Sequence, residues 1–357
     1  MVLFLVFSLA SLYYGVETYA CTGIALSARD GSSVLARTVE WAATPMQCGY
    51  VVVPKGHGHR SFTPEGENGM EYVSRYGYVG IYTEYEPFVV EGVNEAGLSA
   101  GLFFFPNYGE YAPYRQADSL KTLCDMQLVS WILSQFASVE ELKQAVADVN
   151  IVTLNHKIGS VHWRIAGPDG KVVVLEIVDG VPRFFDNDLG VLTNSPGFQW
   201  QMTNLDNYVN LRPGPASPYE MDGGVQLRTT GGGSGMLGLP GDFTPPSRFV
   251  RAAFFQSTAP KWDTGWETVV QAFHILNNFD VPIGVQLPHS QIPEGMYTAT
   301  QFTSATDQKA LRFYYRTSGN SMIRCIDLKD IDFSNVRYQS APLDRTRSEP
   351  VEKIRIR

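Results

Sequence analysis

The sequence predicts an α+β fold in which β-hairpins alternate with pairs of helices. Apolar stretches of strand character occur two at a time around short turn motifs, and segments with apolar residues at helical spacing lie between these hairpins. The sequence lacks the regular strand–helix–strand alternation that would indicate a doubly wound parallel sheet. The chain has 357 residues, of which 44% are hydrophobic, so it can bury a large core without disulfide staples.

The predicted strands form three hairpins and two further strand regions. Asp30 and Gly31 form the turn of the first hairpin, because an Asp-Gly pair between apolar stretches favours a tight turn. The other two hairpins turn at residues 94–97 and 168–170, where glycine follows polar residues. The hairpins cover residues 21–41, 87–106 and 160–180, a short strand covers 50–54 and ends at Pro54, and 301–328 hold two late strands.

Helices are predicted over residues 119–137, 138–149, 246–257 and 265–279. The second of them opens with Ser138 and Glu141, which form the capping-box pattern of a helix start. Pro245 and Pro246 suit the entry of the third helix. The glycine-rich stretch 222–235 lacks the Gly-Lys-Ser/Thr ending of a phosphate-binding loop, so we interpret it as a flexible linker or lid.

Charge and cysteine content exclude several classes of function. The net charge of −8 disfavours nucleic acid as a partner, because phosphate binding requires a cationic face. The four cysteines match no zinc spacing and are too few for a disulfide scaffold in so long a chain. In an oxidising compartment, one pair among Cys48, Cys124 and Cys325 could form a disulfide, and the sequence does not indicate which pair. We expect no metal and no cofactor.

The N-terminus has the pattern of a secretory signal. Residues 2–12 are an apolar run, too short for a membrane span, and Thr18-Tyr19-Ala20 fits a small-residue cleavage site. No Lys or Arg precedes the run, which departs from the usual signal. We expect a signal over 1–20, a single domain over 21–357, and a periplasmic or secreted protein. A buried N-terminal strand or helix is the alternative, and we expect no stable membrane span.

Cleavage after Ala20 would give Cys21 two reactive groups, a thiol and a new α-amine. An ordinary thiol titrates near pH ~8.5 and an α-amine near ~7.7–8.0. The amine can therefore take the proton of the thiol and later pass it to a leaving amine, which combines nucleophile and general base in one residue. A buried cysteine inside a chain would instead be a small, inert hydrophobic residue.

Three stretches together resemble the choloylglycine hydrolase family of N-terminal-nucleophile hydrolases, which includes bile salt hydrolases and penicillin V acylases. They are "CTGIAL…DG…ARTVEW" from Cys21, "VLTNSPGFQWQMTNL" and "LGLPGDFTPPSRFVRAAF". The resemblance implies a four-layer αββα sandwich of two antiparallel sheets flanked by helices. It also implies no metal, no cofactor and a homo-oligomer, a tetramer in the family.

Five residues match the catalytic positions of the family. Cys21 matches the nucleophile, and Arg37 matches the arginine beside it, whose charge favours the thiolate. Glu40 stands where the family usually has an aspartate that positions the terminal amine, so its charge is kept on a longer side chain. Asn194 matches the oxyanion amide, and Arg248 the second active-site arginine.

The second oxyanion donor is less clearly marked. Bile salt hydrolases tend to have Asn and penicillin acylases Tyr after the turn at 94–97, whereas here the stretch is Phe103-Phe104-Phe105. A backbone N–H near Phe103 and Phe104 can still donate, whatever side chain it carries. The same three residues equally fit a core strand that buries alternate side chains.

The resemblance implies an amidase for conjugated bile acids, with penicillin V or other N-acyl compounds as the alternative. Cys21 would attack the amide carbonyl and form a thioester, which water then hydrolyses. Two readings without catalysis stay open. One is a binding module anchored to lipid through an acylated Cys21, and the other is a secreted domain with an inert Cys21.

Overall fold

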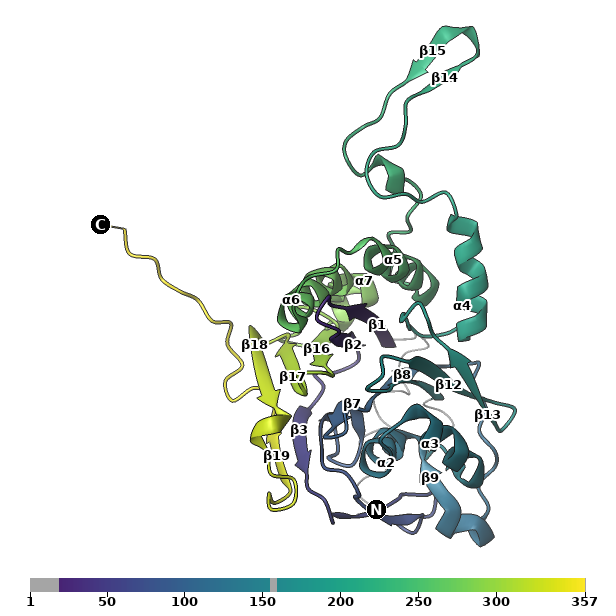
Figure 1. Cartoon of the computed structure of the whole chain (residues 1–357), viewed down its shortest axis with the longest axis vertical. Coiled ribbons are helices and arrows are strands. Elements are labelled where there is room, and N and C mark those ends of the chain that lie inside the picture. Colours follow the sequence, from purple (N-terminus) through teal and green to yellow (C-terminus); the bar gives the residue numbers. More distant parts are fainter. Residues whose placement is uncertain (1–18, 155–158, 357) are drawn as a thin grey trace.

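The computed structural model describes residues 19–154 and 159–356. Two antiparallel sheets stack face to face, with helices on both outer surfaces, a long arm at one end and an extended C-terminal segment (Figure 1). The predicted signal over 1–20 lies almost wholly outside the described residues, so it stays a prediction. Within the described ranges no helix is long and apolar enough to cross a membrane.

The first sheet has five strands and begins with the segment that carries Cys21. Its order is β1 (Tyr19–Ser27), β2 (Ser33–Trp41), β16 (Thr300–Asp307), β17 (Arg312–Thr317) and β18 (Asn320–Asp327). The register of β1 and β2 sets Cys21 opposite Val39 and Gly23 opposite Arg37. β1 is an edge strand, and its free side is therefore available to another segment of the chain.

The second sheet has eight strands, and all its neighbouring pairs are antiparallel. Its order is β13 (Val181–Asp186), β12 (Val172–Val178), β11 (Val161–Ala166), β8 (Ser99–Phe104), β7 (Val89–Asn94), β6 (Tyr78–Thr83), β3 (Cys48–Val53) and β19 (Gln339–Pro342). The central strands β7, β8 and β11 are buried along almost their whole length, as expected for a sheet covered on both faces.

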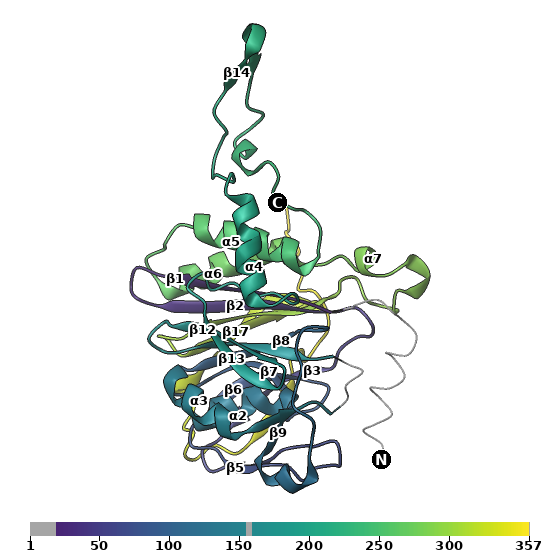
Figure 2. The ribbon, with the colours of Figure 1, turned by 90° about the vertical axis from the view of Figure 1, so that its right-hand side faces the viewer.

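Helices cover the outer face of each sheet, which gives the four layers that Figure 2 shows edge-on. α5 (Pro245–Thr258) packs on β1, and α6 (Gly265–Leu276) packs on β1, β2 and β16. On the other side, α2 (Leu128–Gln135) packs on β7 and β8, followed by α3 (Val139–Ala145). The predicted αββα sandwich is confirmed. The remaining helices are α4 (Phe198–Leu205) and α7 (Ile283–Gln286).

The three predicted hairpins are confirmed as β1–β2, β7–β8 and β11–β12. The expectation of two late strands over 301–328 is wrong, because this region forms three strands, β16, β17 and β18. The missed turn lies between Thr317 and Asn320, where the backbone N–H of Asn320 donates to the Thr317 hydroxyl at 3.1 Å. A Ser-Gly pair at 318–319 marks this turn in the sequence.

The helix predicted over 119–137 is only partly correct, because regular α-helix covers only Leu128–Gln135. Residues Thr122–Cys124 instead form the short strand β9, which pairs in parallel with β10 (Asn150–Val152). The backbone N–H of Cys124 also donates to the Ser61 hydroxyl at 2.8 Å. These long-range partners outweigh a local helical pattern, since propensity is a weak preference.

Part of the stretch 222–235, predicted as a flexible linker or lid, forms regular structure. It begins in the turn of a small hairpin, β14 (Tyr219–Met221) with β15 (Val225–Leu227), at the far end of the projecting arm. Gly223 and Gly224 both have positive φ, which this tight turn requires. A second small hairpin, β4 (Gly58–Arg60) with β5 (Glu71–Val73), lies elsewhere.

Candidate active site

Cys21 lies on the edge strand β1, and residues 192–194 cover the free side of that strand. The backbone of Gly23 exchanges two hydrogen bonds with Leu192, of 2.7 and 3.1 Å. Cys21 lies two residues before Gly23 and Asn194 two residues after Leu192, and there the backbone N–H of Cys21 donates to Oδ1 of Asn194 at 2.9 Å. In the full chain this nitrogen belongs to the peptide bond with Ala20. The antiparallel contact therefore places Asn194 at the atom that cleavage after Ala20 would turn into an α-amine.

The thiol of Cys21 is buried between the two sheets. The backbone N–H of Phe104 in β8 donates to its sulfur. Burial raises the pKa of the thiol above its ordinary value, while Arg37, Arg248 and the Phe104 N–H oppose this shift. The thiol therefore keeps its proton in the uncleaved chain, and an attack by sulfur requires a nearby base.

Arg37 lies on the same face of the hairpin as Cys21 and points between the sheets. Its guanidinium lies 3.9 Å from the centre of the Phe103 ring, and its Nη1 donates to Val90 O at 3.2 Å and to Leu102 O. Glu91 supplies the countercharge, with 3.5 Å between Nη1 and Oε2. Phe103 is fully buried, and its ring packs against the guanidinium of Arg37.

A second buried arginine shares the same carboxylate. Arg164 in β11 lies 3.4 Å from Oε1 of Glu91, and its Nη1 donates to Ile24 O and Ala36 O at 3.0 and 3.1 Å. Glu91 thus lies between two arginines, each of which also binds backbone carbonyls. This triad fixes the spacing of the two sheets next to the thiol.

Glu40 and Arg248 lie on the other face of the first sheet, under α5. Arg248 donates to Asn194 Oδ1 at 2.7 Å, to Thr22 Oγ1 at 2.9 Å and to the carbonyl of Cys21. Desolvation lowers the pKa of this arginine to about 10, and the nearby Glu40 opposes the shift. Arg248 therefore holds both the backbone of Cys21 and the amide oxygen that contacts it.

Glu40 is a buried carboxyl beside Cys21 with a strongly shifted pKa. Burial raises its pKa to about 7, and the charge of Arg248 opposes the shift. Its Oε1 accepts a hydrogen bond from the Thr300 hydroxyl at 3.3 Å, whereas its buried Oε2 has no partner among the described residues. Because Glu40 pairs across the hairpin with Ala20, this open oxygen belongs to a residue directly beside the expected cleavage point.

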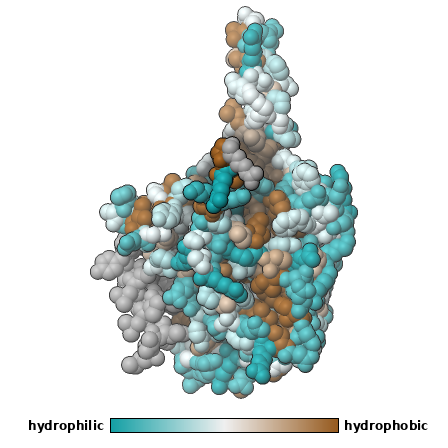
Figure 3. Space-filling view, turned by 90° about the vertical axis from the view of Figure 1, so that its left-hand side faces the viewer, coloured by the Kyte–Doolittle hydropathy of each residue, from teal (hydrophilic) through white to brown (hydrophobic). Residues whose placement is uncertain are grey.

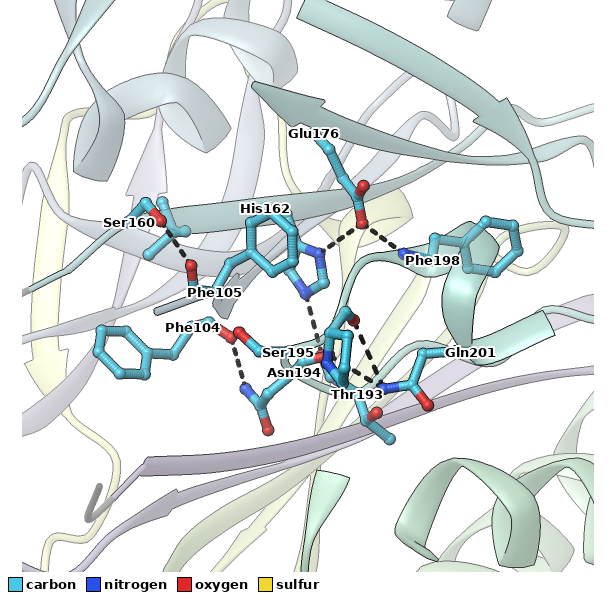
Figure 4. A network of polar contacts seen from close by, with 12 residues as sticks. Phe104, Phe105, Ser160, His162, Glu176, Thr193, Asn194, Ser195, Phe198 and Gln201 are labelled. Carbon is cyan, nitrogen blue, oxygen red and sulfur yellow. Dashed lines mark hydrogen bonds and ion pairs between the residues drawn. The ribbon is translucent and has the colours of Figure 1, made fainter. Parts of the chain in front are cut away.

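A polar network holds the loop that carries Asn194 (Figure 4). The amide nitrogen of Asn194 donates to Phe104 O at 2.8 Å, and the Ser195 hydroxyl donates to Pro106 O at 2.6 Å. Behind this loop, His162 Nε2 contacts Thr193 O at 3.0 Å and His162 Nδ1 contacts Glu176 at 3.2 Å. The peptide between Ser195 and Pro196 is cis.

The structure brings together all five residues that match catalytic positions, Cys21, Arg37, Glu40, Asn194 and Arg248. It also brings in a second set that the sequence alone did not assign to the site, namely Glu91, Arg164, His162 and Glu176. Three of these are charged residues inside otherwise apolar strands, which is the signal that could have found them, because such residues are rarely buried without a partner. All four cysteines lie in the described part of the chain and are free, so no disulfide joins Cys48, Cys124 or Cys325 there.

Comparison with known proteins places the chain among amide hydrolases. The family model for linear amide C–N hydrolases of the choloylglycine hydrolase family matches residues 21–341. A bile salt hydrolase/transferase of Clostridium perfringens is 32% identical over 92% of this chain and 98% of its own length. A penicillin V acylase of Pectobacterium atrosepticum is 24% identical over 78% of this chain and 73% of its own length.

A solved structure of a mutant conjugated bile acid hydrolase from Clostridium perfringens has a similar fold. It superposes with a TM-score of 0.79 at 28% identity and covers 94% of this chain and all of that one. Together with the match to the family model, it shows that this chain belongs to the choloylglycine hydrolase family of linear amide C–N hydrolases.

Proposed function

We propose that removal of residues 1–20 converts this chain into an amidase whose nucleophile is the thiol of Cys21. One observation carries the proposal. The sulfur of Cys21 faces a backbone N–H, and its own backbone nitrogen lies 2.9 Å from an amide that Arg248 holds in place. Nucleophile and base thus belong to Cys21, and the oxyanion donors of Phe104 and Asn194 lie beside it.

In the proposed reaction, the α-amine of Cys21 takes the thiol proton as sulfur attacks the amide carbonyl. The buried thiol is protonated at rest, so a base within the same residue is well suited to this step. The negative charge on the carbonyl oxygen is stabilised by the Phe104 N–H and by the amide of Asn194, which has two N–H groups and uses one of them on Phe104 O. The ammonium then protonates the leaving amine, and water hydrolyses the thioester.

We assign Glu40 the task of positioning the new ammonium. Its Oε2 is buried and unpartnered among the described residues, and a buried carboxylate oxygen gains most from a cation within reach. A carboxyl with a pKa of about 7 ionises readily once an ammonium appears beside it. The longer Glu side chain, compared with the Asp usual in the family, is accommodated by the contact with Thr300.

For the substrate, we propose conjugated bile acids, in which an apolar acyl group is joined to a small polar amine. The relatives named for bile salt hydrolysis support this choice, and penicillin V is the alternative acyl donor because a penicillin V acylase is also related. The ring of Tyr108 is half exposed and packs beside Phe105, which offers apolar surface next to the Phe104 donor.

The test compares the substrates directly. Protein whose N-terminal residue is Cys21 is offered glycine- and taurine-conjugated cholate and, separately, penicillin V, and the released amine or acid is measured. We expect turnover of the bile acids, and none by Cys21→Ala. Cys325→Ala is the matched control, because this thiol is exposed and outside the site. Equal turnover by Cys21→Ala would remove Cys21 from the mechanism.

We further propose that the chain is exported, to the periplasm or the medium, with cleavage after Ala20. The apolar run at 2–12 and the small residue before Cys21 support this. Intact-mass analysis of the exported protein should show a free N-terminal Cys21. A diacylglyceryl adduct on Cys21 would instead support the lipid-anchored binding module.

A homo-oligomer, a tetramer as in the family, is the assembly we propose. The arm around β14 and β15 projects far from the body and carries apolar side chains exposed over a third or more of their surface, at Val209, Tyr219, Met221, Val225, Leu227 and Leu237. Figure 3 shows hydrophobic surface along this arm. Exposed apolar surface of this extent favours a protein partner. Light scattering should show a tetramer for the full chain and a monomer when residues 215–234 are replaced by a short linker.

A further inference from the structure

One imidazole, that of His162, contacts the chain neighbours of both proposed oxyanion donors. Its ring stacks on Phe105 with 4.4 Å between centroids and 5° between planes, and Phe105 follows Phe104, whose N–H faces the thiol. Its Nε2 lies 3.0 Å from the carbonyl of Thr193, and Thr193 precedes Asn194. The ring therefore spans the gap between the two segments that carry the donors (Figure 4).

Glu176 completes the arrangement from the neighbouring strand. It lies 3.2 Å from His162 Nδ1, and the same oxygen, Oε1, accepts the backbone N–H of Phe198 at 2.7 Å. Phe198 is the first residue of α4, just after the Ser195-Pro196 turn. His162 and Glu176 thus hold the loop 193–198 at both of its ends.

The donors and acceptors around His162 explain why the loop 193–198 is held by an imidazole together with a carboxyl group. A carbonyl only accepts, so Nε2 must carry a hydrogen toward Thr193 O. Oε1 of Glu176 accepts from Phe198 and also meets Nδ1, so one proton is shared between Nδ1 and Oε1. Both nitrogens of the ring are occupied, and His162 has no exposed surface. The pair therefore acts on the site through the segments it holds and does not touch the substrate.

We propose that His162 and Glu176 are positioning residues that set the distance between the two oxyanion donors, the Phe104 N–H and the Asn194 amide. The inference rests on the proposed amidase function and deepens it. Oxyanion donors act only when they are preorganised around the developing charge, so a loosened loop lowers the rate of the chemical step more than substrate binding.

Two variants test the pair from its two sides. Glu176→Gln keeps the shape of the side chain, but its amide oxygen cannot carry the proton that Glu176 shares with Nδ1 and has no negative charge to hold that proton on the ring. His162→Phe keeps a ring for Phe105 to stack on and removes the donor to Thr193 O. His59→Phe is the matched control, because His59 also stacks on an aromatic ring, that of Tyr72 at 4.6 Å, outside the site.

We expect kcat to fall by about 10- to 100-fold in Glu176→Gln and His162→Phe, as for other residues that orient catalytic groups, with KM changed less than about twofold. A second readout separates the oxyanion hole from general damage. An aldehyde analogue of cholate forms a tetrahedral adduct on Cys21 and should bind about 10-fold or more weaker, in parallel with kcat. Alkylation of Cys21 by iodoacetamide forms no oxyanion and should change little.

The outcomes are distinct. If the wild-type protein hydrolyses no amide, the proposed function fails. If it does and both variants keep wild-type kcat and aldehyde affinity, the positioning role alone is wrong. A parallel loss of alkylation and aldehyde binding would indicate a general structural effect and would also overturn the proposal. Should His162→Phe fail to fold, as judged by its urea unfolding curve, the nearly isosteric Glu176→Gln decides.

Discussion

Replacing Glu91 by Gln should destabilise the protein far more than the loss of an ordinary ion pair. Glu91 is the shared anion of Arg37 and Arg164, at 3.5 and 3.4 Å, and all three side chains are about 1% exposed. Removing one partner of a buried ionic group leaves charge without compensation and costs about 3–5 kcal/mol. Here two buried guanidinium groups would stay without a countercharge from Glu91, held by backbone carbonyls and the Phe103 ring.

The same geometry predicts a milder effect when Arg164 is replaced. Arg164→Met leaves Glu91 and Arg37 as a balanced pair and keeps an apolar chain near Phe103, so it should cost clearly less than Glu91→Gln. The assay is urea unfolding followed by fluorescence and circular dichroism, from which the free energy of unfolding is extrapolated. Glu71→Gln is the control, because its pair with Arg60 is 66% and 47% exposed and should contribute less than about 1 kcal/mol.

Two results would refute this reasoning. A loss of under about 1 kcal/mol for Glu91→Gln would mean that the arginines do not depend on that carboxylate. A loss for Arg164→Met as large as for Glu91→Gln would mean that packing, and not charge balance, holds the sheets together at this point.

Three further predictions follow from single contacts. Gly23→Ala should cost about 1–3 kcal/mol in unfolding free energy, because a Cβ would lie 2.8 Å from both Arg164 Nη1 and Phe103 Cζ, while Gly241→Ala, with open space around it, should cost little. In the uncleaved chain, the raised pKa of Glu40, about 7, contributes stability that is fully present below pH ~4.5 and is lost as the pH rises through 7. Over this range the free energy of unfolding should fall by about 3 kcal/mol relative to that of Glu40→Gln. Parallel pH dependences of the two proteins would contradict the assignment. Asn194→Leu should lower kcat by about 100- to 1000-fold and also lower stability, because the buried Asn194 bonds Cys21, Arg248 and Phe104. Asn207→Leu, in the exposed 3₁₀ turn after α4, should do neither.

How much of the site could be predicted from sequence depends on how local each contact is. Cys21 and Arg37 share one hairpin, and the Asp30-Gly31 turn sets their register, so a local pattern was enough to bring them together. Asn194 and Arg248 come from distant segments, and only the family resemblance pointed to them. No local pattern could show that Asn194 would lie against the free edge of β1, because that contact depends on how the whole chain folds.

Long-range contacts also explain most of the strands and buried partners that the sequence did not reveal. The strand at Thr122–Cys124 is paired with β10, whereas the apolar spacing over 119–137 taken alone predicts a helix. Glu91 meets two arginines whose strands do not pair with its own, and Arg37 belongs to the other sheet, so only the folded protein brings these three residues together. His162 and Glu176 instead face each other within the predicted hairpin of residues 160–180, so the hairpin register could have indicated this pair. A charged residue inside an apolar strand signals that a buried partner exists, but not which residue it is.

The central claim is that Cys21 attacks with its thiol while its own freed α-amine carries the proton. The most direct measurement is intact-mass and peptide analysis of matured protein that is quenched with acid during turnover of a conjugated bile acid. We predict an acyl group attached as a thioester to a peptide that begins at Cys21, formed and lost at the rate of turnover. Turnover by protein whose Cys21 is still joined to Ala20, or turnover with no acyl group ever found on Cys21, would contradict the account.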